Sequence, residues 1–107
     1  MSWTIKWTKT AKKHLEKYSE NLKEKIDSAI ISMVRYYDGE DEPKPDVKLL
    51  KGKYKGLLRL RIGDYRIIFS MNYNLKEIFI IEVLPRGDAY KKWIKKLQKP
   101  LKFHRQD

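Results

Sequence analysis

Three arginines, Arg59, Arg61 and Arg66, lie close together in the sequence, and their chemistry is that of phosphate binding. A guanidinium group stays protonated at any ordinary pH and can hold two phosphate oxygens at once. Side chains of a β-strand alternate between two faces, so arginines two positions apart share one face. The spacing therefore predicts a cluster of fixed positive charge that suits an anionic ligand.

The stretch that carries these arginines, residues 55–71, is typical of a β-hairpin. Two apolar-rich runs flank the pair Gly63-Asp64, and glycine in the first position of a two-residue connection favours a type II′ turn. This turn places Arg61 opposite Arg66, and like charges opposed across a ladder cost roughly 0.2 to 1 kcal/mol. An anionic partner would explain such an arrangement. The other face of the hairpin is apolar and consists of Leu58, Leu60, Ile62, Tyr65, Ile67 and Phe69.

The positive charge of the chain is confined to its second half. Residues 1–47 hold nine Lys/Arg and nine Asp/Glu, whereas residues 48–107 hold sixteen against five and supply the whole net charge of +11. A surplus on the half that contains the arginine hairpin points to a polyanion, most simply nucleic acid. A lysine-rich surface that only keeps the protein soluble is the alternative.

Composition limits the remaining possibilities. A chain of 107 residues suffices for one domain with a hydrophobic core, so we expect a single domain over residues 1–107. There is no cysteine, and His14 and His104 are far apart, so we expect neither a metal site nor a cofactor. No apolar run approaches the roughly 20 residues that cross a bilayer, and we expect a soluble cytoplasmic protein without a membrane partner.

Hydrophobic periodicity predicts the elements that must position the arginines. Residues 2–7 alternate as a half-buried strand, Thr8 or Thr10 caps a short helix, and Ser19 caps a longer amphipathic helix that ends at Asp38-Gly39. His14 lies off the apolar stripe of the short helix and is expected at the surface. Residues 40–46 form a loop.

The second half supplies the rest of the sheet. Residues 47–54 approach the hairpin, and residues 77–84 form a strand that is apolar on both faces except at Glu82, which is typical of the middle of a sheet. A last helix ends before Pro100, and residues 99–107 form a loose basic tail. We therefore predict an α+β fold of order βααβββα. A mostly antiparallel four-stranded sheet has the two N-terminal helices packed on one face and a C-terminal helix, and the arginines face outward near Arg86 and Tyr90.

Three strings resemble the RelE/ParE toxin superfamily: K-L-L-K-G at 48–52, R-L-R-I-G-D-Y-R-I-I-F at 59–69 and L-P-R-G-D-A-Y at 84–90. The order of elements agrees, so the resemblance spans roughly residues 3–97. RelE-like members are ribosome-dependent ribonucleases that cut mRNA, whereas ParE-like members share the fold but inhibit DNA gyrase. The resemblance implies a toxin of a type II toxin–antitoxin system, whose partners are a RelB-like antitoxin and the ribosome with its mRNA and ribosomal RNA.

The resemblance also implies catalytic residues. Arg66 matches the family's second-strand arginine, Arg86 the arginine after the last strand, and Tyr90 the terminal tyrosine. Arg59 stands where the family often has a lysine proposed as general base, and Leu57 stands where a second lysine is found. An arginine can bind the phosphate, but it is a poor proton acceptor.

The general base must then come from elsewhere in the chain. Lys55, on the arginine face, is the first candidate and His104 the second, because nearby cations could lower the pKa of the lysine. The expected catalytic set is thus Arg59, Arg66, Arg86, Tyr90 and Lys55. The expected RNA-binding residues are Arg61, Lys53, Lys91 and Lys92.

Two other functions remain open from the sequence. One is a ParE-like gyrase inhibitor without nuclease activity. The other is a catalytically weak protein of the same fold that only binds RNA or its antitoxin, as the missing lysines would allow.

Overall fold

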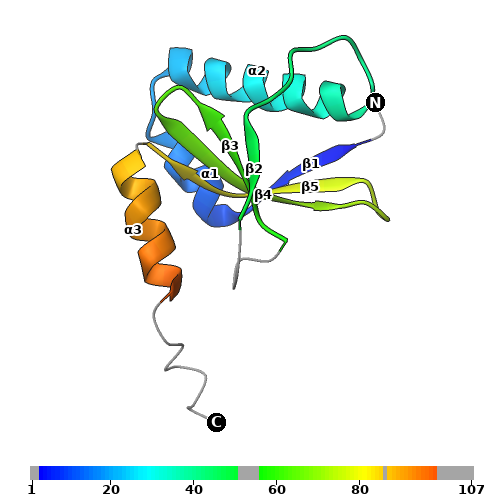
Figure 1. Cartoon of the computed structure of the whole chain (residues 1–107). Coiled ribbons are helices and arrows are strands. Elements are labelled where there is room, and N and C mark those ends of the chain that lie inside the picture. Colours follow the sequence, from blue (N-terminus) through cyan, green and yellow to red (C-terminus); the bar gives the residue numbers. More distant parts are fainter. Residues whose placement is uncertain (1–2, 51–55, 86, 99–107) are drawn as a thin grey trace.

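The computed structural model describes residues 3–50, 56–85 and 87–98 (Figure 1). Within them the chain follows the order βααββββα. The elements are β1 (Thr4–Trp7), α1 (Lys9–Glu16), α2 (Glu20–Tyr37), β2 (Val47–Leu49), β3 (Leu58–Ile62), β4 (Tyr65–Asn72), β5 (Glu77–Leu84) and α3 (Gly87–Gln98). The predicted basic tail, residues 99–107, lies outside the described ranges.

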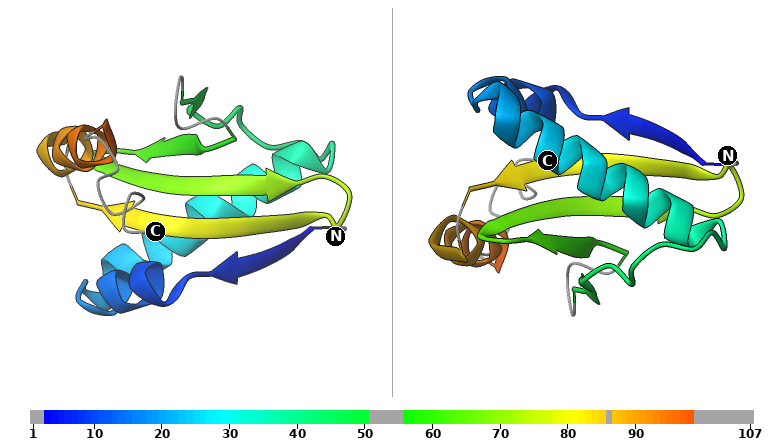
Figure 2. Two further views of the ribbon diagram at one scale, coloured as in Figure 1. Left: turned by 90° about the horizontal axis from the view of Figure 1, so that it is seen from below. Right: turned by 90° about the horizontal axis from the view of Figure 1, so that it is seen from above.

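One five-stranded sheet organises the fold. Its strand order is β1-β5-β4-β3-β2, with β1 parallel to β5 and every other pair antiparallel. α2 crosses one face of the sheet, and α3 stands at the hairpin end on the opposite side (Figures 1 and 2). The sheet face turned away from α2 is called the outer face below.

The α+β class and the mostly antiparallel sheet are confirmed, but the sheet has five strands rather than the predicted four. The additional strand is β2, which pairs with β3 and places Val47 opposite Leu60. Backbone hydrogen bonds extend the pairing at both ends, from Arg61 N to Asp46 O and from Leu50 N to Leu57 O. A three-residue edge strand with exposed residues is too short for the period-two pattern to show in the sequence.

Both N-terminal helices begin where a hydroxyl side chain can cap them. Thr8 accepts a hydrogen bond from Ala11 N at 3.1 Å, and Ser19 accepts one from Leu22 N at 3.3 Å. The Thr8 hydroxyl also donates to the carbonyl of Ile81 on β5, at 2.9 Å. This residue therefore fixes the start of α1 and anchors it to the sheet.

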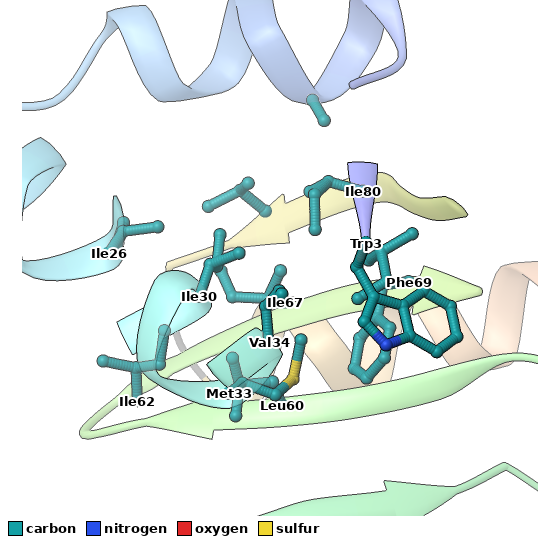
Figure 3. Packing of buried hydrophobic residues seen from close by; sticks show 13 residues of the cluster. Trp3, Ile26, Ile30, Met33, Val34, Leu60, Ile62, Ile67, Phe69 and Ile80 are labelled. Carbon is teal, nitrogen blue, oxygen red and sulfur yellow. The ribbon is translucent and has the colours of Figure 1, made fainter. Parts of the chain in front are cut away.

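The core lies between the sheet and the two N-terminal helices (Figure 3). Helix α1 contributes Ala11 to the core. The residues of β3 and β4 that face the core pair in the predicted register, from Ile62 opposite Tyr65 to Leu58 opposite Phe69. The other helix contributes one fully apolar stripe. Its buried members are Ile26, Ile30, Met33 and Val34.

A bulge in β5 decides which face Glu82 occupies. Phe69 pairs with Ile80 and Ile68 with Glu82, so Ile81 is an extra residue on β5. If β5 continued without the bulge, Ile81 would be paired regularly and Glu82 would share the core face with Ile80. The bulge turns the carboxylate to the outer side and puts Val83 into the core instead.

The buried Glu82 side chain joins α1 to β5. Its Oε1 lies 2.6 Å from His14 Nδ1 and accepts a hydrogen bond from Val83 N at 3.0 Å. His14 was expected at the surface, and its side chain is indeed 37% exposed, but it makes this specific contact. A buried carboxylate needs such partners.

We predict that Phe69→Ala lowers the free energy of unfolding by about 3–5 kcal/mol, because Phe69 is fully buried and the change leaves a cavity. Urea denaturation followed by circular dichroism measures this. The control is Leu75→Ala, at a side chain 65% exposed, where the change should stay within about 0.5 kcal/mol. Equal losses in the two variants would contradict the assigned core.

We also predict a loss of stability at alkaline pH that depends on Tyr18. Burial raises the pKa of the Tyr18 hydroxyl above its ordinary value of 10.0, and Tyr65 and Glu82 raise this pKa further. As the pH rises, the hydroxyl of Tyr18 loses its proton in the unfolded chain before it does so in the folded protein. The contribution of Tyr18 to the free energy of unfolding is therefore fully present below pH 10.0 and is lost as the pH rises through the folded-state pKa. Urea denaturation of Tyr18→Phe at about pH 8 and about pH 11 should show a smaller loss than the wild type shows. Identical losses would contradict the prediction.

Candidate nucleic-acid interface

The arginine end of the outer face forms an open pocket of about 430 Å³. β2, β3, β4 and α3 all contribute to its walls. Five cationic side chains and one carboxylate line it, so its formal charge is strongly positive. The lining residues are Asp46, Lys48, Arg59, Arg61, Arg66, Gly87, Tyr90 and Lys91.

Arg61 and Arg66 face each other across the hairpin and share one acceptor. Arg61 Nε donates to the Gly63 carbonyl at 3.3 Å, and Arg66 Nη1 donates to the same oxygen at 3.1 Å. Arg66 Nη1 also donates to the Tyr65 carbonyl at 3.2 Å. The turn therefore holds two like charges side by side through its own backbone. Gly63 has φ 57°, and this turn conformation suits glycine.

Arg59 is held by an ion pair. Its Nη2 lies 3.2 Å from Asp46 Oδ1, and its side chain is 12% exposed while that of Asp46 is 58% exposed. The Nε of Arg59 is buried and has no hydrogen-bond partner among the described residues. Arg59 is therefore positioned by one carboxylate while part of its donor capacity stays unused.

Three pocket residues were not predicted from the sequence, and two of them, Asp46 and Lys48, are charged; the third is Gly87. Lys48 lies directly opposite Arg59 in the β2–β3 pairing, which brings another cation to the same face. Asp46 precedes β2, and its carbonyl accepts a hydrogen bond from Arg61 N at 3.0 Å. Recognition of β2 as a strand in register with β3 would have found both residues.

Helix α3 begins at the pocket. A Cβ atom added to Gly87, its first residue, would lie 3.8 Å from Arg66 Nη2. The first turn of a helix presents free N–H groups and a partial positive charge. This helix end adds to the positive potential of the arginines, and it brings Tyr90 and Lys91 to the pocket wall.

The structure brings together five of the residues that the sequence singled out: Arg59, Arg61, Arg66, Tyr90 and Lys91. Lys92 is exposed on α3 and does not line this pocket. Lys53, Lys55, Arg86 and His104 lie outside the described residues, so their roles remain predictions.

No group of three or more His, Asp or Glu side chains in the described ranges could hold a metal ion. None of the helices described is both long enough and apolar enough to cross a membrane.

A family model and several solved structures match this chain. The model of the ParE toxin of type II toxin–antitoxin systems matches residues 5–90. Comparison with curated protein sequences found no significant match. A chain of the archaeal RelE–RelB complex from Pyrococcus horikoshii OT3 is 31% identical, with a TM-score of 0.64, and the match covers 81% of this chain and 98% of that one.

Two further structures are similar. A chain of the RelB–RelE antitoxin–toxin complex from Methanococcus jannaschii is 26% identical, with a TM-score of 0.61 and coverage of 82% of this chain and 98% of that one. The YoeB/ParE toxin from Agrobacterium tumefaciens is 17% identical, with a TM-score of 0.63, and the match covers 78% of this chain and 98% of that one. At this identity the similarity supports the fold alone.

The family model spans most of the chain, and the match to the Pyrococcus horikoshii structure combines 31% identity with nearly full coverage of that chain. The protein is thus a toxin of type II toxin–antitoxin systems and belongs to the RelE/ParE superfamily.

Proposed function

We propose that this toxin is a metal-independent endoribonuclease that cuts mRNA on translating ribosomes and so inhibits translation. The observation that carries the proposal is the pocket in which Arg59, Arg61 and Arg66 surround a space bordered by Tyr90. Guanidinium groups fixed beside a helix N-terminus suit a phosphate of the RNA backbone.

The reaction would begin when a ribose 2′-OH loses its proton and attacks the adjacent phosphorus. The bond from phosphorus to the 5′ oxygen of the next nucleotide then breaks, which leaves a 2′,3′-cyclic phosphate and a 5′-OH. Negative charge builds up on the phosphate oxygens in the transition state. Arg61 and Arg66 are held in place by the Gly63 carbonyl, so they can stabilise this charge with little reorganisation.

The 2′-OH needs a proton acceptor, and Asp46 is the one carboxylate among the described lining residues. Its side chain is more than half exposed, and the contact with Arg59 orients it. We assign it as a candidate general base, beside Lys55 and His104, which the sequence suggested. Tyr90 would orient the 2′-OH or stack on a base, and a neighbouring cation such as Lys48 would protonate the 5′ oxygen.

The partners follow from the same pocket. The similar structures from Pyrococcus horikoshii and Methanococcus jannaschii are complexes with RelB. We propose a cognate RelB-like antitoxin that covers the basic pocket of this toxin. On the ribosome, Lys91 and Lys92 of α3 would contact the phosphates of ribosomal RNA or mRNA.

A ParE-like inhibitor of DNA gyrase is the second candidate, because the family model that matches residues 5–90 is that of ParE toxins. This function would need no general base at Asp46 and no 2′-OH on the ligand. A catalytically weak protein that only binds RNA or antitoxin is the third. The arrangement of three arginines around one pocket with a tyrosine favours the nuclease.

We predict that primer extension on mRNA from translating ribosomes will show cuts within codons. Arg66→Ala should lower the cleavage rate about 10²–10³-fold through loss of charge stabilisation. Asp46→Asn should lower it about 10²-fold or more through loss of the proton acceptor. Tyr90→Phe and Arg86→Ala should also weaken cutting.

The control for this experiment is Arg35→Ala. Arg35 lies on α2 and pairs with Glu42, and it does not line the pocket. This variant should cut as the wild type does. Intact mRNA together with inhibited supercoiling by purified gyrase would replace the nuclease with the ParE-like function.

We predict a salt signature for the binding of single-stranded RNA with blocked 2′ oxygens. Arg61→Ala should weaken binding equally for different sequences and reduce the slope of log K against log salt by about 0.7, because one phosphate contact is lost. Fluorescence anisotropy across a salt series measures this slope. An unchanged slope would mean that Arg61 makes no phosphate contact.

A further inference from the structure

A second hollow lies on the outer face, toward the end of the sheet remote from the arginines. Its volume is about 600 Å³, and β4, β5 and the turn between them form it. In the view from the side opposite α2, no helix of the described chain crosses β4 and β5 at this end (Figure 2, left). The lining residues are Ser70, Met71, Asn72, Tyr73, Asn74, Glu77 and Phe79.

Phe79 is the unexpected residue of this hollow. It lies on β5, an interior strand, where large apolar side chains are normally covered, yet it is 39% exposed. Its cross-strand partner is Ser70, and Lys6 of β1 lies on its other side. A ring that is exposed to this extent beside small and polar neighbours is accessible to a stacking partner.

The groups around Phe79 are polar but nearly neutral in sum. Glu77 is neutralised by Lys6, whose Nζ lies 2.7 Å from Glu77 Oε2. Asn72 Oδ1 accepts a hydrogen bond from Leu75 N at 3.1 Å, which fixes the amide and leaves its NH₂ group as a donor. Asn74 adds a second amide. An aromatic platform with amides beside it is the chemistry that binds a nucleobase.

Tyr73 is held in place at the edge of the hollow. Its ring meets that of Trp3 edge-on, with centroids 5.6 Å apart, and its hydroxyl contacts Met71 Sδ at 3.7 Å. Asn72 and Tyr73 are therefore held by contacts within the wall of the hollow, although Tyr73 itself is 68% exposed. A preformed wall lowers the entropy cost of binding.

The hollow and the arginine pocket lie on the same side of the sheet. Arg59 pairs with Ile68, and Ser70, two residues further along β4, pairs with Phe79. From strand spacing and rise, the backbone of Arg59 lies about 12 Å from that of Phe79. Ile68 and Glu82 lie between the two sites on this face, and both are buried.

The two sites differ in charge in the same way as the phosphate and the base of a nucleotide. One site is strongly cationic and suits a phosphate, while the other is neutral, aromatic and rich in amides and suits a base. We propose that the hollow around Phe79 is a nucleobase-binding subsite for the single-stranded RNA whose phosphate occupies the arginine pocket. The proposal rests on the nuclease function proposed above and adds a second contact point on the substrate.

The test uses the full-length toxin and a fluorescein-labelled single-stranded RNA with 2′-O-methyl groups, which cannot be cut. Phe79→Ala should bind this RNA about tenfold more weakly, the lower part of the range for loss of one stacked base. An otherwise identical abasic oligonucleotide should bind the wild type and Phe79→Ala equally. Phe79→Tyr should retain wild-type affinity, because it keeps the ring.

The matched control is Leu75→Ala, because Leu75 is exposed in the same turn but does not line the hollow. It should bind RNA as the wild type does. Arg66→Ala should weaken binding of both oligonucleotides, since it acts on the phosphate.

Three results would overturn the subsite. In the first, Phe79→Ala binds base-containing RNA as tightly as the wild type does. In the second, Phe79→Ala loses as much affinity for the abasic strand as for the base-containing strand. In the third, Phe79→Ala loses affinity only for the antitoxin, which would make the hollow a protein contact. In each case wild-type cleavage of mRNA would leave the nuclease function standing. If the wild type neither binds nor cuts RNA, the nuclease function itself fails and the subsite fails with it.

Discussion

The two-residue turn at Gly63 and Asp64 is the constraint on which the rest of the molecule depends. It fixes the register of β3 and β4, and a slip of one residue would exchange the two faces of these strands. In the observed register the apolar residues of the hairpin enter the core and the arginines lie outside. The Gly63 carbonyl then accepts hydrogen bonds from both opposed arginines, so the turn that sets the register also organises the site.

The pairing of Arg61 opposite Arg66 is unfavourable for stability, and it is tolerated because the core on the other face of the hairpin is well packed. Opposing Arg61 to Arg66 costs roughly 0.2 to 1 kcal/mol, whereas burying one large side chain such as Phe69 contributes several times that amount. The bulge at Ile81 has the complementary role on β5. It removes the Glu82 charge from the core and gives it His14 and a backbone amide as partners.

Sequence patterns predicted most of this architecture because the relevant signals are local. Alternation along residues 58–69, the glycine of the turn and the hydroxyl cap at Ser19 each specify their own element, and the structure agrees with each. For α1 the sequence left Thr8 and Thr10 open, and the structure places Thr8 at the cap. The failures concern information that is not local. β2 exists because β3 offers an edge, so Asp46 and Lys48 could not be assigned to the site from their own neighbours in the sequence. The contact between His14 and Glu82 likewise depends on a bulge that the apolar run of β5 does not reveal.

Under the proposed function, the outer face would gain its selectivity from the separation of charge along the sheet. A surface that is cationic throughout would hold any polyanion with little regard to its bases, because phosphate contacts carry no sequence information. Here the cations are concentrated where β2, β3, β4 and the start of α3 meet, whereas Glu77, the one charged side chain among the described residues that line the remote hollow, is paired with Lys6. A rigid duplex keeps its base faces stacked inside and cannot offer one to Phe79. A single strand can place a phosphate among the arginines and turn an unstacked base onto the ring, and this difference favours unpaired RNA over double-stranded DNA as the ligand of this face.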